Sequence, residues 1–146
     1  MGMTAFVSEI YAVARRLLEV PGHLSPKSVA DACSVALHEV TRTEYGSEFE
    51  GQSEGGPFSV LSFRMLADSS ERPRSMVVLD ICQEVEITEA ELRSYFDLST
   101  DNMSFNPRIP RAGAVFFSEQ HANRTLVLQF ALHSDLLQAI AVRENM

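Results

Sequence analysis

The residue types that could catalyse a reaction are present, but their spacing does not combine them. The chain has two cysteines, Cys33 and Cys82, and four histidines. A catalytic cysteine needs a base within hydrogen-bond reach. His38 lies five residues after Cys33, about 140° further around a helix, so the two side chains would not share a face. We therefore expect both cysteines to pack as small hydrophobic residues, without a disulfide framework.

No metal-binding or phosphate-binding motif is complete. His38-Glu39 matches the beginning of His-Glu-x-x-His, but the fifth position is Arg42, so the second ligand is missing. The glycines within residues 44–57 are not followed by the lysine of a phosphate-binding loop. The acidic residues of 97–102 lack the spacing and the closing glutamate of a calcium loop. We expect no metal site and no cofactor.

Four glutamates gather where a predicted strand meets a predicted helix: Glu84, Glu86, Glu89 and Glu91. Paired carboxylates can act as acid and base in glycoside hydrolysis. Here Glu91 follows Thr88 at the spacing of a capping box, and Glu89 suits the positive end of the same helix. The pattern favours a solvated edge, with an acidic docking patch as the alternative. We predict that the protein is not an enzyme.

A cluster of aromatic and acidic residues is the strongest indication of a binding surface. Residues 44–57 are rich in glutamate, glycine and serine, which predicts an acidic surface loop. The candidate partner-binding residues are Glu44, Tyr45, Glu48, Phe49, Glu50 and Glu54. Aromatic anchors among acidic side chains suit a basic protein partner. The alternative is that Phe58 begins a core strand and the rest is a solvated loop.

The charge of the chain limits its partners. The net charge is −8, from 20 acidic and 12 basic residues. Such a surface repels phosphate backbones and anionic lipids, so nucleic-acid and membrane partners are disfavoured. It suits attraction to a basic toxin or effector, and it equally suits solubility alone. No apolar run reaches the roughly 18 residues of a membrane span. We expect a cytoplasmic protein. The sequence leaves the oligomeric state open, with a homodimer as one alternative. It also leaves open whether an N-terminal leader was removed.

The elements that would position these residues begin with two helices. Apolar residues recur at helical spacing over residues 4–20, and a Pro-Gly pair follows. Ser25-Pro26 predicts the start of a second helix, with serine as the cap and proline in the first turn. Its apolar face extends to Val40, which predicts a helix up to that residue.

Strands dominate the rest of the chain. Residues 58–67 and 75–85 alternate between apolar and polar side chains, which predicts a hairpin. The capping box predicts a helix to about Phe96.

The remaining strands follow an irregular crossing over 97–112, with at most a short strand around Phe105. Residues 113–119 and 125–132 predict two strands joined by a turn. Residues 135–142 allow a strand or a short helix, and their β-branched residues favour the strand.

The order of these elements predicts the fold class. Hairpins rather than β-α-β crossovers indicate an antiparallel sheet. We expect an α+β fold in which two N-terminal helices precede an antiparallel sheet interrupted by one helix. The length of 146 residues fits one domain over residues 1–146.

One pattern resembles a known class of protein. It consists of Val77-x-Leu79-x-Ile81, Ile87-Thr88-Glu89-Ala90-Glu91-Leu92-x-x-x-Phe96, Leu126-x-Leu128-x-Phe130 and Ile140-x-Val142. This arrangement resembles small acidic bacterial immunity proteins, the antitoxins of type VI or contact-dependent toxin systems. The resemblance implies a protein that binds a cognate toxin and occludes its active site, with no chemistry of its own.

Two other interpretations stay open. Length, acidity and α+β composition also resemble type III secretion effector chaperones, which are dimers whose chain closes on a helix. A strand after Ser134 would favour an immunity protein, and a helix there would favour a chaperone. The third interpretation is an enzyme of unrecognised type, which a pocket joining His121 or His133 with Glu119 would favour.

Overall fold

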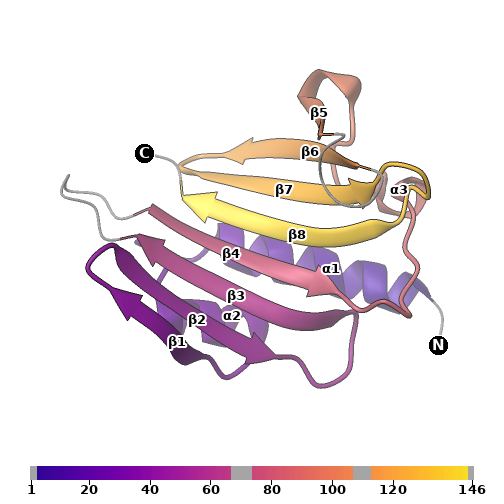
Figure 1. Cartoon of the computed structure of the whole chain (residues 1–146). Coiled ribbons are helices and arrows are strands. Elements are labelled where there is room, and N and C mark those ends of the chain that lie inside the picture. The colour runs from indigo at the N-terminus through magenta and orange to yellow at the C-terminus, as the bar shows by residue number, and fades with distance from the viewer. Residues whose placement is uncertain (1–2, 67–73, 107–112, 145–146) are drawn as a thin grey trace.

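The protein is built around one antiparallel sheet with its helices packed against one side (Figure 1). The computed structural model describes residues 3–66, 74–106 and 113–144. The helical elements are α1 (Met3–Leu18), α2 (Pro26–Cys33), the single turn α3 (Glu89–Leu92) and the 3-10 turn η1 (Thr100–Asn102). The strands are β1 (His38–Thr43), β2 (Gly46–Gln52), β3 (Phe58–Leu66), β4 (Arg74–Ile81), β5 (Met103–Asn106), β6 (Ala114–His121), β7 (Arg124–Ala131) and β8 (Leu137–Glu144). The predicted α+β class, with two N-terminal helices before the sheet, is confirmed.

The strand order places the last strand beside the fourth. The sheet runs β1-β2-β3-β4-β8-β7-β6-β5, and each neighbouring pair is antiparallel. The first four strands and the last four strands each form a meander, and the β4–β8 pair joins the two meanders. The strands β4, β8 and β7 are therefore paired along both edges, whereas β1 and β5 are the edge strands.

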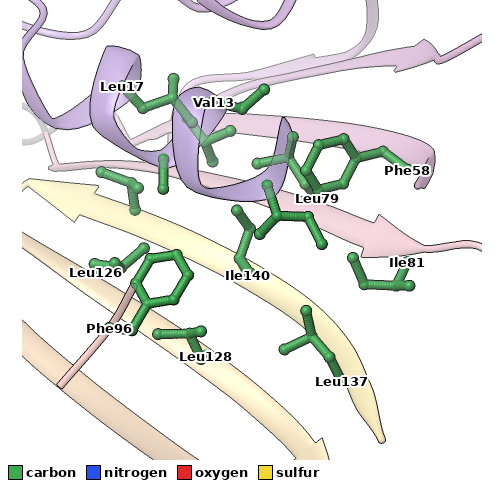
Figure 2. Close-up of a cluster of buried hydrophobic side chains, with 14 of the residues drawn as sticks. Val13, Leu17, Phe58, Leu79, Ile81, Phe96, Leu126, Leu128, Leu137 and Ile140 are labelled. Carbon is green, nitrogen blue, oxygen red and sulfur yellow. The ribbon is translucent and has the colours of Figure 1, made fainter. Parts of the chain in front are cut away.

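The core lies between α1 and the middle of the sheet. Figure 2 shows Val13 and Leu17 of α1 facing Leu79 of β4 and Ile140 of β8. Apolar residues at helical spacing give α1 one apolar stripe. Its fully buried side chains are Val7, Ile10, Val13, Ala14 and Leu17. Removing this stripe from water is the main reason that the helix holds its position on the sheet.

Arg124 at the start of β7 closes the carboxyl end of α1. The last carbonyl groups of a helix have no partner within the helix. Nη1 of Arg124 donates to the carbonyl oxygens of Leu17 (3.2 Å), Leu18 (3.2 Å) and Val20 (2.6 Å), and Nη2 donates to that of Gly22. The arginine is only 2% exposed. A buried side chain of the sheet thus fixes the end of the helix.

The second helix begins where the sequence predicted but ends earlier. Ser25 caps it, because the Ser25 hydroxyl accepts a hydrogen bond from the amide of Ser28 (3.1 Å). The prediction that this helix extends to Val40 is wrong. The helix ends at Cys33, Ser34 adopts a left-handed backbone with a φ of 56°, and β1 follows. The β-branched residues of β1 favour a strand, and the pairing with β2 is a tertiary effect that local periodicity does not reveal.

The prediction of an acidic loop over residues 44–57 is also wrong. The middle of this segment is β2, which is paired with β1 on one side and β3 on the other. Gly51 serves a close approach there, because a Cβ would overlap the carbonyl oxygen of Ala36 and lie 2.6 Å from Cγ1 of Val35. Only the turn before β2 and the connection after it are irregular.

Later elements follow the sequence more closely. The amide of Thr88 donates to Oε1 of Glu91 (3.0 Å), so the capping box is present. The helix α3 is nevertheless a single turn, and the prediction that it extends to Phe96 is wrong. The short strand predicted around Phe105 is present as β5. Residues 135–142, for which the sequence allowed a strand or a short helix, contribute to the strand β8.

Candidate binding surface

Helices cover one face of the sheet, and among the described residues no helix or strand packs over the opposite face, which is called the open face below (Figure 1). Side chains alternate between the two faces along each strand. On β4, Val77 and Leu79 are buried beneath the helices, whereas Met76, Val78 and Asp80 project from the opposite face. The register of the sheet continues this alternation into the neighbouring strands. The open face is therefore one continuous surface.

A hollow of about 460 Å³ lies over the centre of the open face. Its floor is β8, where Ala139 and Ala141 project only a methyl group. Longer side chains form its sides, among them Met76 of β4, Val127 of β7 and Phe116 of β6. Exposed apolar hollows of this kind are typical of binding surfaces.

Opposite charges mark the two ends of this hollow. Arg143 lines the hollow and is paired across the strands with Met76. Asp80 lies four residues further along β4, across from the lining residue Ala139. Partial burial raises the pKa of the Asp80 carboxyl above its ordinary value of 3.8. Within the described ranges neither side chain forms a salt bridge, so both charges are available to a partner.

Two acidic residues of β2 lie on the same open face, beside the hollow. Glu48 is paired across the strands with Arg64, and Glu50 with Ser62. Oε1 of Glu48 is 3.6 Å from Nη2 of Arg64, a partly exposed contact that contributes little stability. Ser62 in turn pairs with Val78, which lines the hollow. The acidic margin and the hollow are therefore parts of one surface.

The other predicted binding residues lie elsewhere. Phe49 points to the covered face, where its ring centroid is 6.2 Å from that of Phe63. Tyr45 is 73% exposed in the turn between β1 and β2, next to the exposed Glu44. Glu54 is exposed in the connection from β2 to β3. The structure therefore brings together the two glutamates of β2 and places Tyr45 beside Glu48, where both line a small hollow of about 140 Å³. It separates these residues from Phe49, which lies between the glutamates in sequence.

Both cysteines are poor nucleophiles. Burial raises the pKa of the Cys33 thiol to about 12, and the positive charge of Arg16 opposes this only in part. Burial also raises the pKa of Cys82, the negative charge of Glu84 raises it further, and a backbone hydrogen bond opposes both. Since the thiolate is the reactive form, both thiols are protonated at neutral pH. They are not joined in a disulfide.

A histidine and a carboxylate do meet at the end of β6. Nε2 of His121 is 3.3 Å from Oε1 of Glu119, and the amide of Asp97 donates to the other oxygen of Glu119 (3.2 Å). A second hollow of about 340 Å³ lies beside α3 and β6, but neither this hollow nor the one on the open face is lined by His121, His133 or Glu119. Neither hollow therefore meets the condition that would favour an enzyme.

One catalytic pattern was missed from the sequence. Gly51-Gln52-Ser53-Glu54-Gly55 matches Gly-x-Ser-x-Gly, which in a nucleophile elbow leads from a strand into a helix. Here the pattern leads from β2 into β3, and the hydroxyl of Ser53 donates to the carbonyl oxygen of Gly55 (3.3 Å). The pattern therefore lacks the backbone geometry that its chemistry requires.

Arg143, which lines the hollow, and Asp80, which lies across from the lining residue Ala139, were also missed as binding residues. The alternation of residues 75–85 places Asp80 opposite the apolar stripe of its strand, which is a signal for an outward carboxylate. Arg143 and the two alanines follow the segment whose structure the sequence left open. Their place on the open face follows only from the pairing of β8 between β4 and β7.

The described part of the chain holds no group of three or more histidine, cysteine, aspartate or glutamate side chains placed to bind a metal ion. In the same ranges, no helix has the length and apolar character needed to cross a membrane. In comparisons with known proteins, no family model, no curated protein and no solved structure matches the chain.

Proposed function

We propose that the protein is a non-catalytic immunity protein that binds a cognate bacterial toxin and occludes its active site. The observation that carries this proposal is the open face of the sheet. Its central hollow, the charges of Asp80 and Arg143, and the two glutamates of β2 form one continuous surface. A large uncovered face with an apolar centre and charged margins is typical of a protein-binding surface.

The charge of the chain supports a basic partner. The net charge of −8 attracts a basic protein over long range and raises the association rate. Glu48 and Glu50 bring part of that charge to the open face itself. Two of the four predicted acidic binding residues, Glu48 and Glu50, therefore keep a place in the proposal, although they belong to a strand rather than a loop; Glu44 and Glu54 lie outside that strand.

The surroundings of the reactive side chains support a role without catalysis. The thiols of Cys33 and Cys82 have raised pKa values, and the pair of His121 and Glu119 lines neither hollow. A catalytic site needs its nucleophile and base within reach of one another. A protein that only binds a partner needs no nucleophile and base placed together.

The end of the chain bears on the alternative of a secretion chaperone. A closing helix would have favoured the chaperone, and residues 137–144 form the strand β8 in the middle of the sheet. This feature favours the immunity protein. The chaperone stays as the second proposal because its partner would also meet an apolar surface.

The test is capture of the partner from the native host, followed by an inhibition assay. Recovery of one folded basic domain in near-equal amount, whose toxicity the protein abolishes, would support the proposal. Recovery of an exported protein held through an extended N-terminal segment would support the chaperone instead. A captured domain whose toxicity is unchanged, or no partner at all, would refute the immunity function.

A further inference from the structure

We infer that the hollow over β8 receives one amphipathic helix of the protein partner, with a basic side chain at Asp80 and an acidic side chain at Arg143. This inference rests on the proposed function, because it names the part of the partner that the open face would bind. It adds the secondary structure of the bound segment and the spacing of its charges.

The pairing of the strands favours a helix over an added strand. A partner strand can join a sheet only where backbone groups are free, which is at an edge. The strands β4, β8 and β7 are paired on both sides, so the hollow offers side chains alone. Its floor of Ala139 and Ala141 runs along one strand between taller side chains. A furrow of this form fits the ridge of apolar side chains along one face of a helix.

The two charges set a spacing on the bound helix. Asp80 is paired with Ala139, and Arg143 is paired with Met76, so the charges lie at opposite ends of four residues of strand. At ~3.4 Å per strand residue this span is ~14 Å, which a helix with a rise of 1.5 Å per residue covers in about nine residues. Residues nine positions apart lie on opposite faces of a helix, so the nearest spacing that keeps both side chains on the bound face is eight residues, or about 12 Å. The partner helix should therefore carry a basic and an acidic residue about eight positions apart, beside an apolar ridge.

Charge complementarity supports this occupant. Asp80 and Arg143 form no salt bridge within the described ranges, and burial raises the pKa of Asp80. A basic side chain placed beside this carboxylate would restore the stabilisation of its ionised form. The glutamates of β2 are not at the Asp80 end: Glu50 lies in the row of Ala141, and Glu48 lies in the row of Arg143, with Arg64 and Met76 between them. They offer further contacts to basic residues of the partner on the β2 side of the surface.

The probes are three fluorescent helical peptides of about five turns, each with the same leucine ridge. They carry Lys and Glu, Lys and Lys, or Glu and Glu at two positions eight residues apart, which share one face of the helix. Fluorescence anisotropy should show that the wild-type protein binds the Lys/Glu peptide about tenfold more tightly than the other two. The charge reversal R143E should shift the preference to the Lys/Lys peptide, and D80K should shift it to the Glu/Glu peptide. Equal binding of all three peptides, or no binding, would overturn the inference.

The floor of the hollow provides a second test. Ala141→Trp would fill the furrow from the open face and should abolish binding of the Lys/Glu peptide. Ala90→Trp is the matched control, because Ala90 is exposed on α3, on the other side of the sheet. Circular dichroism checks that both variants fold. If Ala141→Trp and Ala90→Trp bind the peptide alike, the furrow is not the site.

A second copy of the chain is the competing occupant. Concentration-dependent dimerisation that Ala141→Trp abolishes, measured by analytical ultracentrifugation, would overturn the inference in favour of a homodimer. Neutralisation of the toxin named in the proposed function gives an independent test. If the wild-type protein neutralises that toxin and Ala141→Trp does so equally well, the function stands and the inference fails. If the wild-type protein does not neutralise it, the function fails, and the peptide preferences still decide what the furrow binds.

Discussion

Nη2 of Arg124 lies 3.6 Å from Oε2 of Glu144, and the two side chains are only 2% and 4% exposed. The same glutamate oxygen accepts a hydrogen bond from the amide of Leu24 (3.3 Å) and lies 3.4 Å from Nδ1 of His23. One buried pair thus connects β7, β8 and the loop between the first two helices. Replacing one partner of such a buried ion pair strongly destabilises the fold, because the charge of the other partner stays buried without compensation.

The variant Arg124→Met should lower the free energy of unfolding by about 3–5 kcal/mol. It leaves the charge of Glu144 without its guanidinium and the last carbonyl groups of α1 without their donor. Urea denaturation measures the loss. The control is Arg15→Met, whose ion pair with Glu19 is 40% and 61% exposed and should contribute less than about 1 kcal/mol. Similar losses for both variants would show that Arg124 does not hold the helix.

Gly51→Ala should also destabilise the protein, by about 1–3 kcal/mol through overpacking. The added Cβ would overlap the carbonyl oxygen of Ala36, a backbone atom that cannot rotate away. Ser53→Ala, two residues further on, is the control and should leave the midpoint of thermal unfolding nearly unchanged. An unchanged midpoint for Gly51→Ala would contradict the close approach between β2 and the segment after α2.

The fold was predictable where local chemistry decides the structure. The cap at Ser25 and the capping box at Thr88 are sequence signals, and each marks the start of a helix in the structure. The strands β1 and β2 were missed because β1 is exposed along its whole length, whereas β2 is polar, contains two glycines and is mostly only partly buried. The backbone of β2 is held by pairing with β3, and that of β1 by pairing with β2, a tertiary effect that no short window of sequence contains.

The candidate site was predictable only in part, for the same reason. Glu48 and Glu50 were identified by charge, but the pattern could not show that Phe49 between them points to the core. The alternation of apolar and polar residues along β4 predicts that the side chain of Asp80 points away from the core. Arg143 comes beside the same hollow only because β8 inserts next to β4, and that contact joins residues far apart in the chain.

The buried thiol of Cys33 should make the free energy of unfolding fall as the pH becomes alkaline. Burial raises its pKa in the folded protein to about 12 from an ordinary 9.0, so the unfolded chain releases the proton first. The stability contributed by the neutral thiol is complete below pH 9 and is lost as the pH rises toward 12. At pH 10 the loss should be about 1.4 kcal/mol. Urea denaturation at pH 8 and pH 10 should show that the wild-type protein loses about this much more than Cys33→Ala. Equal losses in the two proteins would contradict the raised pKa.

The glutamates of β2 should control the rate at which a basic partner binds. Reversing both charges, with Glu48→Lys and Glu50→Lys, should lower the association rate about tenfold at low salt, because the encounter is steered by the field of the open face. Stopped-flow measurements with the captured partner should show this difference shrinking as salt is added, since the screening length falls to about 10 Å at 0.1 M. The matched control reverses the exposed Glu84 and Glu86, which changes the net charge equally but lies outside the open face. If the control slows association as much as the β2 variant, steering comes from the net charge alone, and the acidic margin of the open face has no special role.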